Sequence, residues 1–398
     1  MPNDPQLPPE SDIPEEKTTP ESNEMTPEEL AEAQEYGRIE LRCTILDLMI
    51  DLAYLAVATF LIAVPLSAAM DRCPVLGGYW TLRVLFMFLI ILGLHFLVSF
   101  PLSYYSGHVI EHRFGLSRQT FGAWFWRWCK KVMLAAAFGI AMYLGLFWLI
   151  HWTGSLWWLV AAGAFFVISV ILGQLAPVLI IPLFYKVQKL DRPDLNERMQ
   201  KLAEGTGLSI EGVYRLDLSE ETAKANAMLA GLGSTRRVLM GDTLLDGFSL
   251  DEIEVVFAHE IGHHVFHHIR KMILIGIVYI AVGFWLCDLA LKAWAAAQGT
   301  PLDYAQVPAY MVPMFMLVMF LFGNLLGPIQ NANSRRYERQ CDRYALERTG
   351  NPDAYRAAFQ KLARLNKDDP NPHPIEVFLF HSHPPIAERL KMADHPSD

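Results

Sequence analysis

The segment His259-Glu260-Ile261-Gly262-His263, an H-E-x-x-H motif inside an apolar helical stretch, decides how the rest of this 398-residue sequence is interpreted. Histidines four positions apart project from one helix face about one turn, roughly 6 Å, from each other. Two imidazoles at that separation can bind one zinc ion. Glu260 follows the first histidine and can take a proton from an attacking water as general base. The motif therefore predicts a zinc peptidase site, and a helix surface with solvated histidines is the alternative interpretation.

The third ligand decides the class of zinc site. A metzincin needs glycine and histidine where this chain has Phe266 and Ile269, so that class is excluded. His267 lies eight residues after His259, a helical rise of about 12 Å, which is too far for both to join His263 on one ion. We therefore interpret the remaining histidines as residues at the cytoplasmic edge: His264, His267 and His268.

A better third ligand is Glu338, in the segment Ser334-Arg335-Arg336-Tyr337-Glu338-Arg339-Gln340-Cys341-Asp342. On a helix, Glu338 and Asp342 share one face. Glu338 can complete a tetrahedral ligand set with one open position, and Asp342 can accept the free N–H of a ligating imidazole. Ordinary salt bridges between these carboxylates and neighbouring arginines are the alternative.

Composition indicates a membrane protein. Hydrophobic residues make up 53% of the chain, aromatic residues 12%, and the mean hydropathy is +0.23. Much of the acid behind the net charge of −9 lies before residue 40, in a Pro- and Glu-rich tail without the features of a signal peptide. The five cysteines indicate neither disulfides nor a thiolate metal site. No basic stripe or phosphate loop indicates nucleic-acid binding.

Six segments are long and apolar enough to span a bilayer, and they are 44–67, 80–105, 132–152, 155–186, 271–296 and 308–328. The prolines Pro177 and Pro182 predict a kink or early exit in the fourth. Lys and Arg gather on the side that carries the motif, whereas the opposite loops offer little beyond Arg72. The positive-inside rule makes that side cytoplasmic. The residues counted are Arg113, Arg118, Arg127, Lys130, Lys131, Lys186, Lys189, Arg270, Lys271, Arg335 and Arg336.

The polar insertion between the fourth and fifth spans predicts a small α+β region. Leu195 to Gly207 is amphipathic with helical spacing, and Gly212 to Ser219 and Arg236 to Leu245 have the pattern of strands. A sheet there would offer an edge on which an extended peptide can pair. Ser249, with Glu252 three residues later, forms a capping box that starts the metal helix at about Leu250.

Polar residues inside the spans are costly in lipid, so we expect them to face a chamber or to pair internally. Among them, His95 lies deepest, and an interhelical hydrogen bond is its expected role. The set is Asp47, Asp51, His95, Gln174, Asp288 and Asn324.

From about Tyr36 to Leu390 the chain resembles the type I CaaX prenyl endopeptidases, integral-membrane zinc peptidases of the gluzincin class. Several motifs carry the resemblance together: Glu111-His112-Arg113-Phe114-Gly115-Leu116-Ser117-Arg118-Gln119-Thr120, Pro182-Leu183-Phe184, Asn226-Ala227, Asp242-Thr243-Leu244-Leu245, the H-E-x-x-H motif, the Glu338 segment, and His383-Pro384-Pro385 with Arg389. In three places the chain departs from the family pattern: Met228, His264 and Cys341 replace two aromatic residues and an alanine. A further N-terminal span of seven-helix members has no counterpart here.

The resemblance implies a mainly α, polytopic membrane fold with about six helices around a chamber and a small α+β zinc-peptidase domain on the cytoplasmic side. It implies one zinc ion on His259, His263 and Glu338, with Glu260 as general base and Asp342 behind a ligand histidine. Further family positions are Asn226, which holds substrate backbone, and His383 and Arg389, which lie near the metal. Asn226 and Arg389 are the expected substrate-binding residues. His383 is the first candidate to stabilise the negative tetrahedral oxygen, and a rigid turn is the alternative for it.

The expected organisation is an acidic disordered tail (1–35), four transmembrane helices with a cytoplasmic loop at 106–131 (36–186), a cytoplasmic metallopeptidase region with the H-E-x-x-H helix (187–270), two more transmembrane helices (271–328) and a cytoplasmic tail with the third ligand and the His383-Pro384-Pro385 motif (329–398). We expect a zinc endopeptidase of the bacterial inner membrane, with its active site toward the cytoplasm. Its substrates are membrane-associated or hydrophobic peptides, with prenylated CaaX-type C-termini as one candidate class. A quality-control protease similar to HtpX is the alternative, and a channel or transporter is a weaker one, because paired broken helices are absent.

Overall fold

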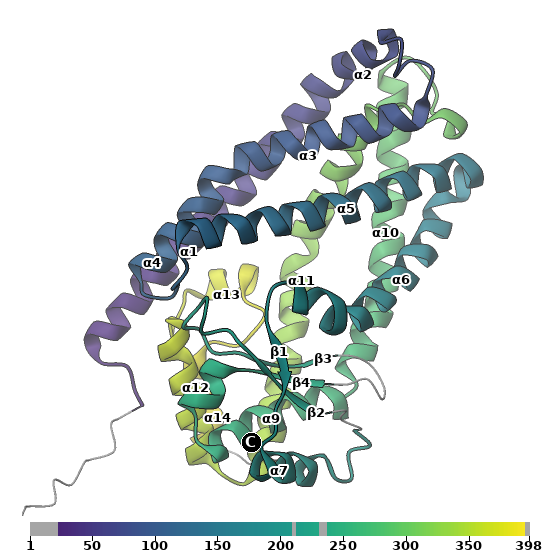
Figure 1. The fold of residues 1–398 in the computed structure, drawn as a ribbon. Coiled ribbons are helices and arrows are strands. Elements are labelled where there is room, and N and C mark those ends of the chain that lie inside the picture. The colour runs from purple at the N-terminus through teal and green to yellow at the C-terminus, as the bar shows by residue number, and fades with distance from the viewer. Residues whose placement is uncertain (1–22, 209–211, 231–236, 395–398) are drawn as a thin grey trace, which may run out of the picture.

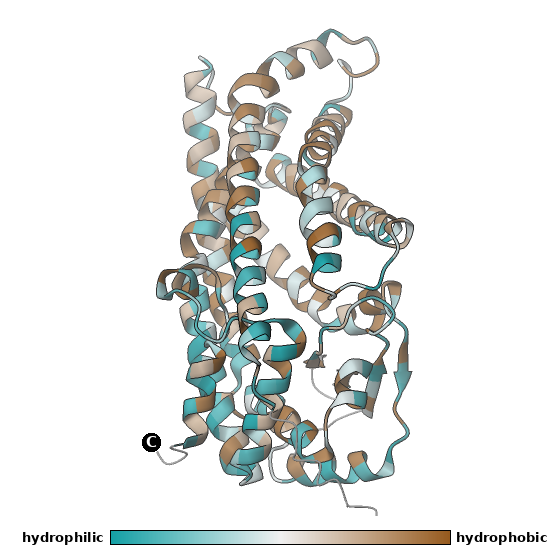
Figure 2. Cartoon of the chain, turned by 90° about the vertical axis from the view of Figure 1, so that its left-hand side faces the viewer, coloured by the Kyte–Doolittle hydropathy of each residue, from teal (hydrophilic) through white to brown (hydrophobic). Residues whose placement is uncertain are grey.

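Long helices form one part of the fold, and a smaller region of short helices and strands lies at one end of them (Figure 1). This description covers residues 23–208, 212–230 and 237–394 of a computed structural model. Figure 2 shows apolar residues over the long helices and hydrophilic residues concentrated in the smaller region. That distribution suits helices in a bilayer and a second region in water.

Five helical runs are long and apolar enough to cross a membrane: Pro27–Arg72, Trp80–Arg113, Phe121–Leu183, His268–Ala297 and Met311–Thr349. The expected third and fourth segments share one run, which consists of α5 (Phe121–Thr153) and α6 (Trp157–Leu175). They are separate helices in Figure 1, because Gly154 takes a positive φ of 58° and starts a 3-10 turn between them. The six expected segments thus correspond to five continuous runs.

The other long helices carry local irregularities where the sequence provides them. In the first run α1 (Pro27–Val57) passes through a π-turn into α2 (Ala63–Arg72), and in the second α3 (Trp80–Tyr104) passes through another into α4 (Glu111–Arg113). After Leu175 the chain leaves α6 through a π-turn containing Pro177 and a 3-10 turn containing Pro182. The predicted early exit is therefore confirmed.

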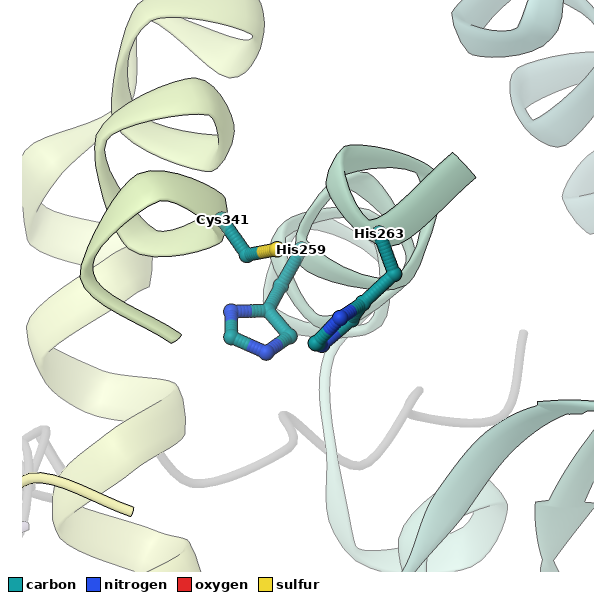
Figure 3. A group of neighbouring side chains, drawn as sticks. All are labelled: His259, His263 and Cys341. Carbon is teal, nitrogen blue, oxygen red and sulfur yellow. The ribbon is translucent and has the colours of Figure 1, made fainter. Parts of the chain in front are cut away.

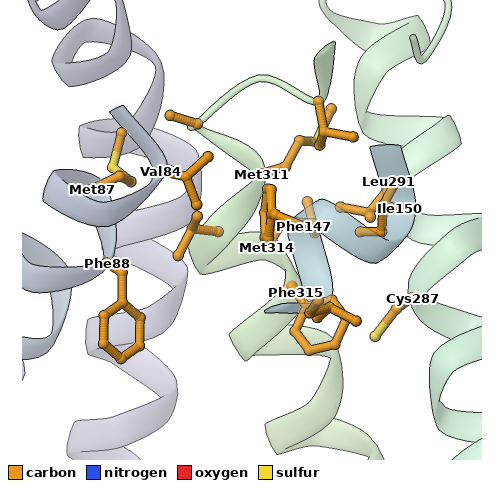
Figure 4. Close-up of a cluster of buried hydrophobic side chains, with 14 of the residues drawn as sticks. Val84, Met87, Phe88, Phe147, Ile150, Cys287, Leu291, Met311, Met314 and Phe315 are labelled. Carbon is orange, nitrogen blue, oxygen red and sulfur yellow. The ribbon is translucent and has the colours of Figure 1, made fainter. Parts of the chain in front are cut away.

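Interdigitated side chains hold the long helices together at the end distant from the small region (Figure 4). In lipid the association of helices depends on such packing and on hydrogen bonds rather than on removal of apolar surface from water. The labelled core residues come from α3 (Val84, Met87, Phe88), α5 (Phe147, Ile150), α10 (His268–Ala297; Cys287, Leu291) and α11 (Met311–Thr349; Met311, Met314, Phe315).

Three of the polar residues within the spans pair internally, as expected. The Nε2 of His95 lies 2.7 Å from the Oδ1 of Asp51, which joins α3 to α1. Asp288 is buried in α10, and its Oδ1 accepts hydrogen bonds of 2.8 Å from both the Trp157 indole and the Tyr304 hydroxyl. These contacts offset the cost of placing a carboxylate in the membrane part.

A four-stranded sheet in the order β1-β2-β4-β3 lies in the smaller region, where the sequence predicted two strands. Its strands are β1 (Val187–Lys189), β2 (Gly212–Leu216), β3 (Ala227–Ala230) and β4 (Arg237–Gly241). β2 and β4 pair in parallel, and β1 and β3 add antiparallel edges. The outer strands are short, and their three or four residues give too little alternation to be recognised in the sequence.

The prediction of a strand from Arg236 to Leu245 is wrong at its end, because helix α8 spans Asp242–Gly247. The buried Asp242 accepts hydrogen bonds from the backbone N–H groups of Leu218 (2.8 Å) and Ser219 (2.9 Å). Burial opposes ionisation of Asp242, but hydrogen bonds to Ser219 and to these amides lower its pKa. A carboxylate at the start of a helix also favours the helix over the strand.

The remaining helices pack around the sheet: α7 (Pro193–Ala203), α9 (Leu250–Val265), α12 (Pro352–Asn366), α13 (Pro374–Phe380) and α14 (Ile386–Asp394). α7 is the amphipathic helix predicted at 195–207, shifted by a few residues. α9 is central to the core of this region and buries Ile253, Phe257 and Ile261. α11 is continuous through residue 328, so one helix leads from the membrane part into the small region (Figure 1).

Candidate active site

The helix α9 begins and ends where local interactions require it. The Ser249 side chain accepts from the Glu252 N–H, and the Glu252 carboxylate accepts from the Ser249 N–H, so the predicted capping box is confirmed. The helix ends at Val265, and His267 takes a left-handed conformation with φ of 56° before α10 starts. His259 and His263 consequently lie in the last two turns of a rigid, buried helix.

α11 brings a carboxylate to these two histidines. The Nε2 of His259 lies 3.1 Å from Glu338 Oε2, and the Nε2 of His263 lies 3.3 Å from Glu338 Oε1. Among the described residues, the buried Oε2 of Glu338 has no well-aligned hydrogen bond, because its 3.1 Å contact with His259 Nε2 is close in distance but does not have hydrogen-bond geometry. A buried carboxylate oxygen without a partner is costly unless a cation binds it. Two imidazoles and one carboxylate are also a ligand set typical of catalytic zinc sites, so these residues fit a zinc ion.

The electrostatics of the group favour a cation. Burial opposes protonation of His259, but hydrogen bonds to Asp342 and Glu338 prevail and raise its pKa to about 9. Two carboxylates thus stabilise positive charge at a buried imidazole, and a metal ion can supply that charge in place of a proton.

Behind His259 lies a second carboxylate with its own cationic partner. The Oδ1 of Asp342 is 2.9 Å from His259 Nδ1, and the Arg389 guanidinium donates to both Asp342 oxygens, at 2.6 and 3.0 Å. Arg389 is buried and stacks on Phe359, with the guanidinium carbon 3.8 Å from the ring centroid. Burial opposes the charge of Arg389, but Asp342 prevails and raises its pKa. This pair fixes the orientation of the His259 ring.

Cys341 is the other donor near the histidines, and its thiol and the two imidazoles offer atoms within 4.8 Å of one another (Figure 3). In Figure 3 both rings project to the same side, whereas the thiol lies beside the stem of His259. Its Sγ packs against Gly262, where an added Cβ would lie 3.1 Å from it. Glu338 contacts the Nε2 atoms of both histidines, and the Nε2 of His259 is the nitrogen that does not face Asp342, so the geometry favours Glu338 over Cys341 as a metal ligand.

Gly262 permits the close approach of α9 and α11. A Cβ at this position would lie 3.0 Å from the Cys341 Cα and 3.1 Å from its Cβ, so the helices would have to separate. We expect Gly262→Ala to lower the free energy of unfolding by about 1–3 kcal/mol through overpacking. Thermal unfolding in detergent measures the change.

Gly247→Ala is the matched control, because nothing lies within 4 Å of the Cβ it would add. We expect this variant to unfold at the original temperature or slightly above it. Equal stability of both variants would contradict the close packing of α9 on α11.

The catalytic motif faces the edge of the sheet. The Oε2 of Glu260 accepts a 3.2 Å hydrogen bond from the backbone N–H of Leu229, in edge strand β3. Asn226, directly before β3, is exposed. Both residues line a cavity of about 410 Å³ between the small region and α1, together with His259, Glu338, His383 and Arg389. Six of the eight site residues predicted from sequence thus line one cavity, and the other two, His263 and Asp342, contact residues that line it.

His383 also lies at this cavity, on the segment between α13 and α14. Its Nε2 is 3.6 Å from Glu338 Oε2, and its side chain is 62% exposed. The Nδ1 of the ring is 3.0 Å from the Ser382 hydroxyl. The imidazole is therefore near the proposed ligands and accessible to a molecule in the cavity.

The position of one histidine in the structure differs from the position predicted from the sequence. His268 was expected at the cytoplasmic edge, but it is fully buried at the start of α10. The left-handed turn at His267 separates α10 from α9 and directs the chain so that His268 returns toward the metal helix. Helical spacing continued from His263 could not indicate this, because the helix does not continue.

Comparisons with known proteins agree with this geometry. Residues 11–186 match the family described as CAAX prenyl protease N-terminal, five membrane helices, and residues 189–397 match peptidase family M48. The chain belongs to peptidase family M48. The resemblance to the CaaX prenyl endopeptidases is thereby confirmed. The description of that N-terminal family mentions five membrane helices, whereas the described residues before 187 form four long helical segments.

Individual M48 relatives cover most of the chain. CAAX prenyl protease 1 of Saccharomyces cerevisiae is 30% identical over 320 residues, which are 76% of this chain and 70% of that protein. An uncharacterized metalloprotease of Bacillus subtilis, YhfN, is 27% identical over 300 residues, 75% and 70% of the two chains. The crystal structure of S. mikatae Ste24p superimposes with a TM-score of 0.83 at 25% identity and covers 94% of this chain and 91% of that one.

Membership in M48 and the apolar helical runs make this chain a multi-pass membrane zinc endopeptidase. The predicted fold class, a mainly helical membrane protein with a small α+β peptidase region, is confirmed. An M48 peptidase acts on a peptide or protein. The comparisons favour neither the quality-control protease nor the channel or transporter.

Proposed function

We propose that one zinc ion binds His259, His263 and Glu338 and that this site cleaves peptides with lipidated, CaaX-type C-termini at the cytoplasmic face of a bacterial inner membrane. The observation that carries the metal site is the buried carboxylate of Glu338, which faces the Nε2 atoms of two imidazoles from another helix. The cavity beside them is lined by His259 and Glu338 and gives a peptide access to the site.

The residues around the cavity have distinct parts in hydrolysis. When bound, zinc polarises the scissile carbonyl and lowers the pKa of water. Glu260 takes the proton of the attacking water and returns it to the leaving amine. The Leu229 N–H orients this carboxylate with a 3.2 Å hydrogen bond. Asn226 binds substrate backbone beside the β3 edge, and an N–H of His383 stabilises the negative oxygen of the tetrahedral intermediate.

Arg389 acts in this proposal through Asp342 rather than on the substrate. Its guanidinium donates to both Asp342 oxygens, and its face is covered by Phe359. The pair keeps the His259 Nδ1–H fixed, so that Nε2 is directed at the metal. This role replaces the substrate-binding role expected from the resemblance.

The membrane and the relatives support the substrate class. The cavity is bordered on one side by Gly37 and Glu40 of α1, a membrane run, so a substrate held at the bilayer surface can reach it. Relatives named CAAX prenyl protease 1 cover about three quarters of the chain, and a relative from Bacillus subtilis supports a bacterial setting. The Lys and Arg residues beside the membrane runs support a cytoplasmic site.

A pair of peptides tests the substrate class. We expect a peptide with a farnesylated cysteine near its C-terminus to be cleaved with a higher kcat/KM than the same peptide with an unmodified cysteine, because the lipid partitions to the bilayer and holds the peptide there. Rates are measured in vesicles containing the protein. Equal rates would contradict prenyl selectivity and would indicate unmodified hydrophobic peptides as substrates, as in a quality-control protease.

A further inference from the structure

His268 is connected to a proposed zinc ligand by a short chain of polar contacts. Its Nδ1 lies 3.2 Å from the Nδ1 of His263, and its Nε2 lies 2.9 Å from the Oε1 of Gln340. The ring is fully buried and stacks on Tyr337, with centroids 4.2 Å apart and an interplanar angle of 19°. Neither His268 nor Gln340 has a role in the proposed hydrolysis.

The order of protons along this chain follows from the donor and acceptor capacity of each group. In the proposed site the Nε2 of His263, which faces Glu338, gives its lone pair to the metal, so the ring hydrogen is on Nδ1 and is donated. A neutral imidazole has one N–H and one lone pair. The Nδ1 of His268 must therefore accept, which places its own hydrogen on Nε2, opposite the Gln340 Oε1. A carbonyl oxygen can only accept, so every contact has one donor and one acceptor.

We infer that His268 is a positioning residue that accepts the Nδ1 hydrogen of His263 and thereby directs His263 Nε2 at the metal, and that Gln340 fixes the tautomer of His268. The inference rests on the proposed zinc site. It assigns the two ligand histidines different partners, since His259 is held by the charged Asp342–Arg389 pair and His263 by a neutral imidazole.

The Cys341 thiol is the competing donor to the same lone pair of His268. Its Sγ lies 3.7 Å from His268 Nδ1, compared with 3.2 Å for His263 Nδ1. A thiol is a weak donor, and the lone pair can serve only one strong donor. His263 is therefore the principal partner, and the thiol packs beside the contact.

Two substitutions separate the acceptor from the packing of the ring. His268→Phe keeps a ring that can stack on Tyr337 but removes the acceptor. His268→Asn removes the ring and places a carbonyl oxygen near the original position of Nδ1. We expect His268→Phe to weaken zinc binding about 10-fold or more, as for other partners of metal-bound histidines, and His268→Asn to retain most of the affinity.

Zinc affinity is measured on the full-length protein by competition with a chromophoric chelator, and the visible spectrum of the Co²⁺-substituted protein reports ligand geometry. We expect His268→Phe to change this spectrum. If His268→Asn loses zinc as much as or more than His268→Phe, the ring packs rather than accepts, and the inference is overturned. If His268→Phe fails to fold, Gln340→Leu takes its place, and unchanged affinity in that variant overturns the inference.

Three further variants calibrate the result. His267→Asn, at an exposed left-handed position that asparagine tolerates, and Cys341→Ala are expected to keep the original affinity. A loss in Cys341→Ala equal to that in His268→Phe would make the thiol the partner and overturn the inference. If Glu338→Ala weakens zinc binding and His268→Phe does not, the inference fails while the zinc site stands. If neither does, the proposed site itself is wrong.

Discussion

Glu260→Gln lowers kcat for peptide hydrolysis by about 10²–10⁴-fold, the usual contribution of a general base, and leaves the zinc content unchanged. Glutamine keeps the size of the side chain, and its carbonyl oxygen can still accept from the Leu229 N–H. It cannot take a proton from water. Cleavage of a fluorogenic peptide and zinc analysis of the same purified sample give both results.

Glu254→Gln is the matched control for this variant. Glu254 lies on the same helix, where its carboxylate pairs with Arg198 at 2.9 Å, and it does not line the cavity. We expect its activity to equal that of the original protein. Undiminished cleavage by Glu260→Gln would exclude Glu260 as general base, and loss of zinc in that variant would show that the carboxylate helps to hold the metal.

The second prediction with a large effect concerns the affinity of the protein for zinc. Glu338→Ala is expected to weaken zinc binding by more than about 100-fold, because it removes a ligand, whereas loss of a residue behind a ligand costs about 10–100-fold. The variant also removes the acceptor that both His259 and His263 Nε2 atoms face. Chelator competition measures the affinity, and a thermal melt of the zinc-free protein separates metal loss from unfolding.

Cys341→Ala tests the choice of third ligand, because Cys341 is the other donor close to both histidines. We expect this variant to retain its zinc, since the thiol packs against Gly262. Retention of zinc by Glu338→Ala together with its loss from Cys341→Ala would reverse the assignment.

The sequence was most informative where chemistry depends on regular spacing. The separation of His259 and His263 and the shared face of Glu338 and Asp342 both follow from helical geometry, and the capping box at Ser249 placed the start of α9. That α9 and α11 meet was a hypothesis when Glu338 was chosen as the third ligand, and the resemblance implied it as well. Residues 75 or more positions apart come together through tertiary packing, which local spacing does not determine.

The errors have local causes. Arg236 to Leu245 continues an apolar pattern past Gly241, but the hydrogen bonds that Asp242 accepts from Leu218 and Ser219 end the strand. β1 and β3 exist because β2 and β4 offer them partners. His268 was assigned to the edge because the left-handed residue His267 could not be foreseen; asparagine and glycine are the usual signals for such a turn.

The 39-residue helix α11 has a mechanical consequence for the metal site. Met311 to Glu338 is 27 residues, or about 40 Å at 1.5 Å per residue, so a rigid tilt of one degree about the far end displaces Glu338 by about 0.7 Å. His259 and His263 lie on α9, which is outside the membrane runs but packs closely on α11 at Gly262 and Cys341. A spanning helix can tilt to match the thickness of the bilayer, within the limits that packing against its neighbours imposes. The thickness of the surrounding bilayer can therefore influence the position of Glu338 relative to the two histidines. Extraction into detergent removes that influence, although detergent makes no contact with the ligands.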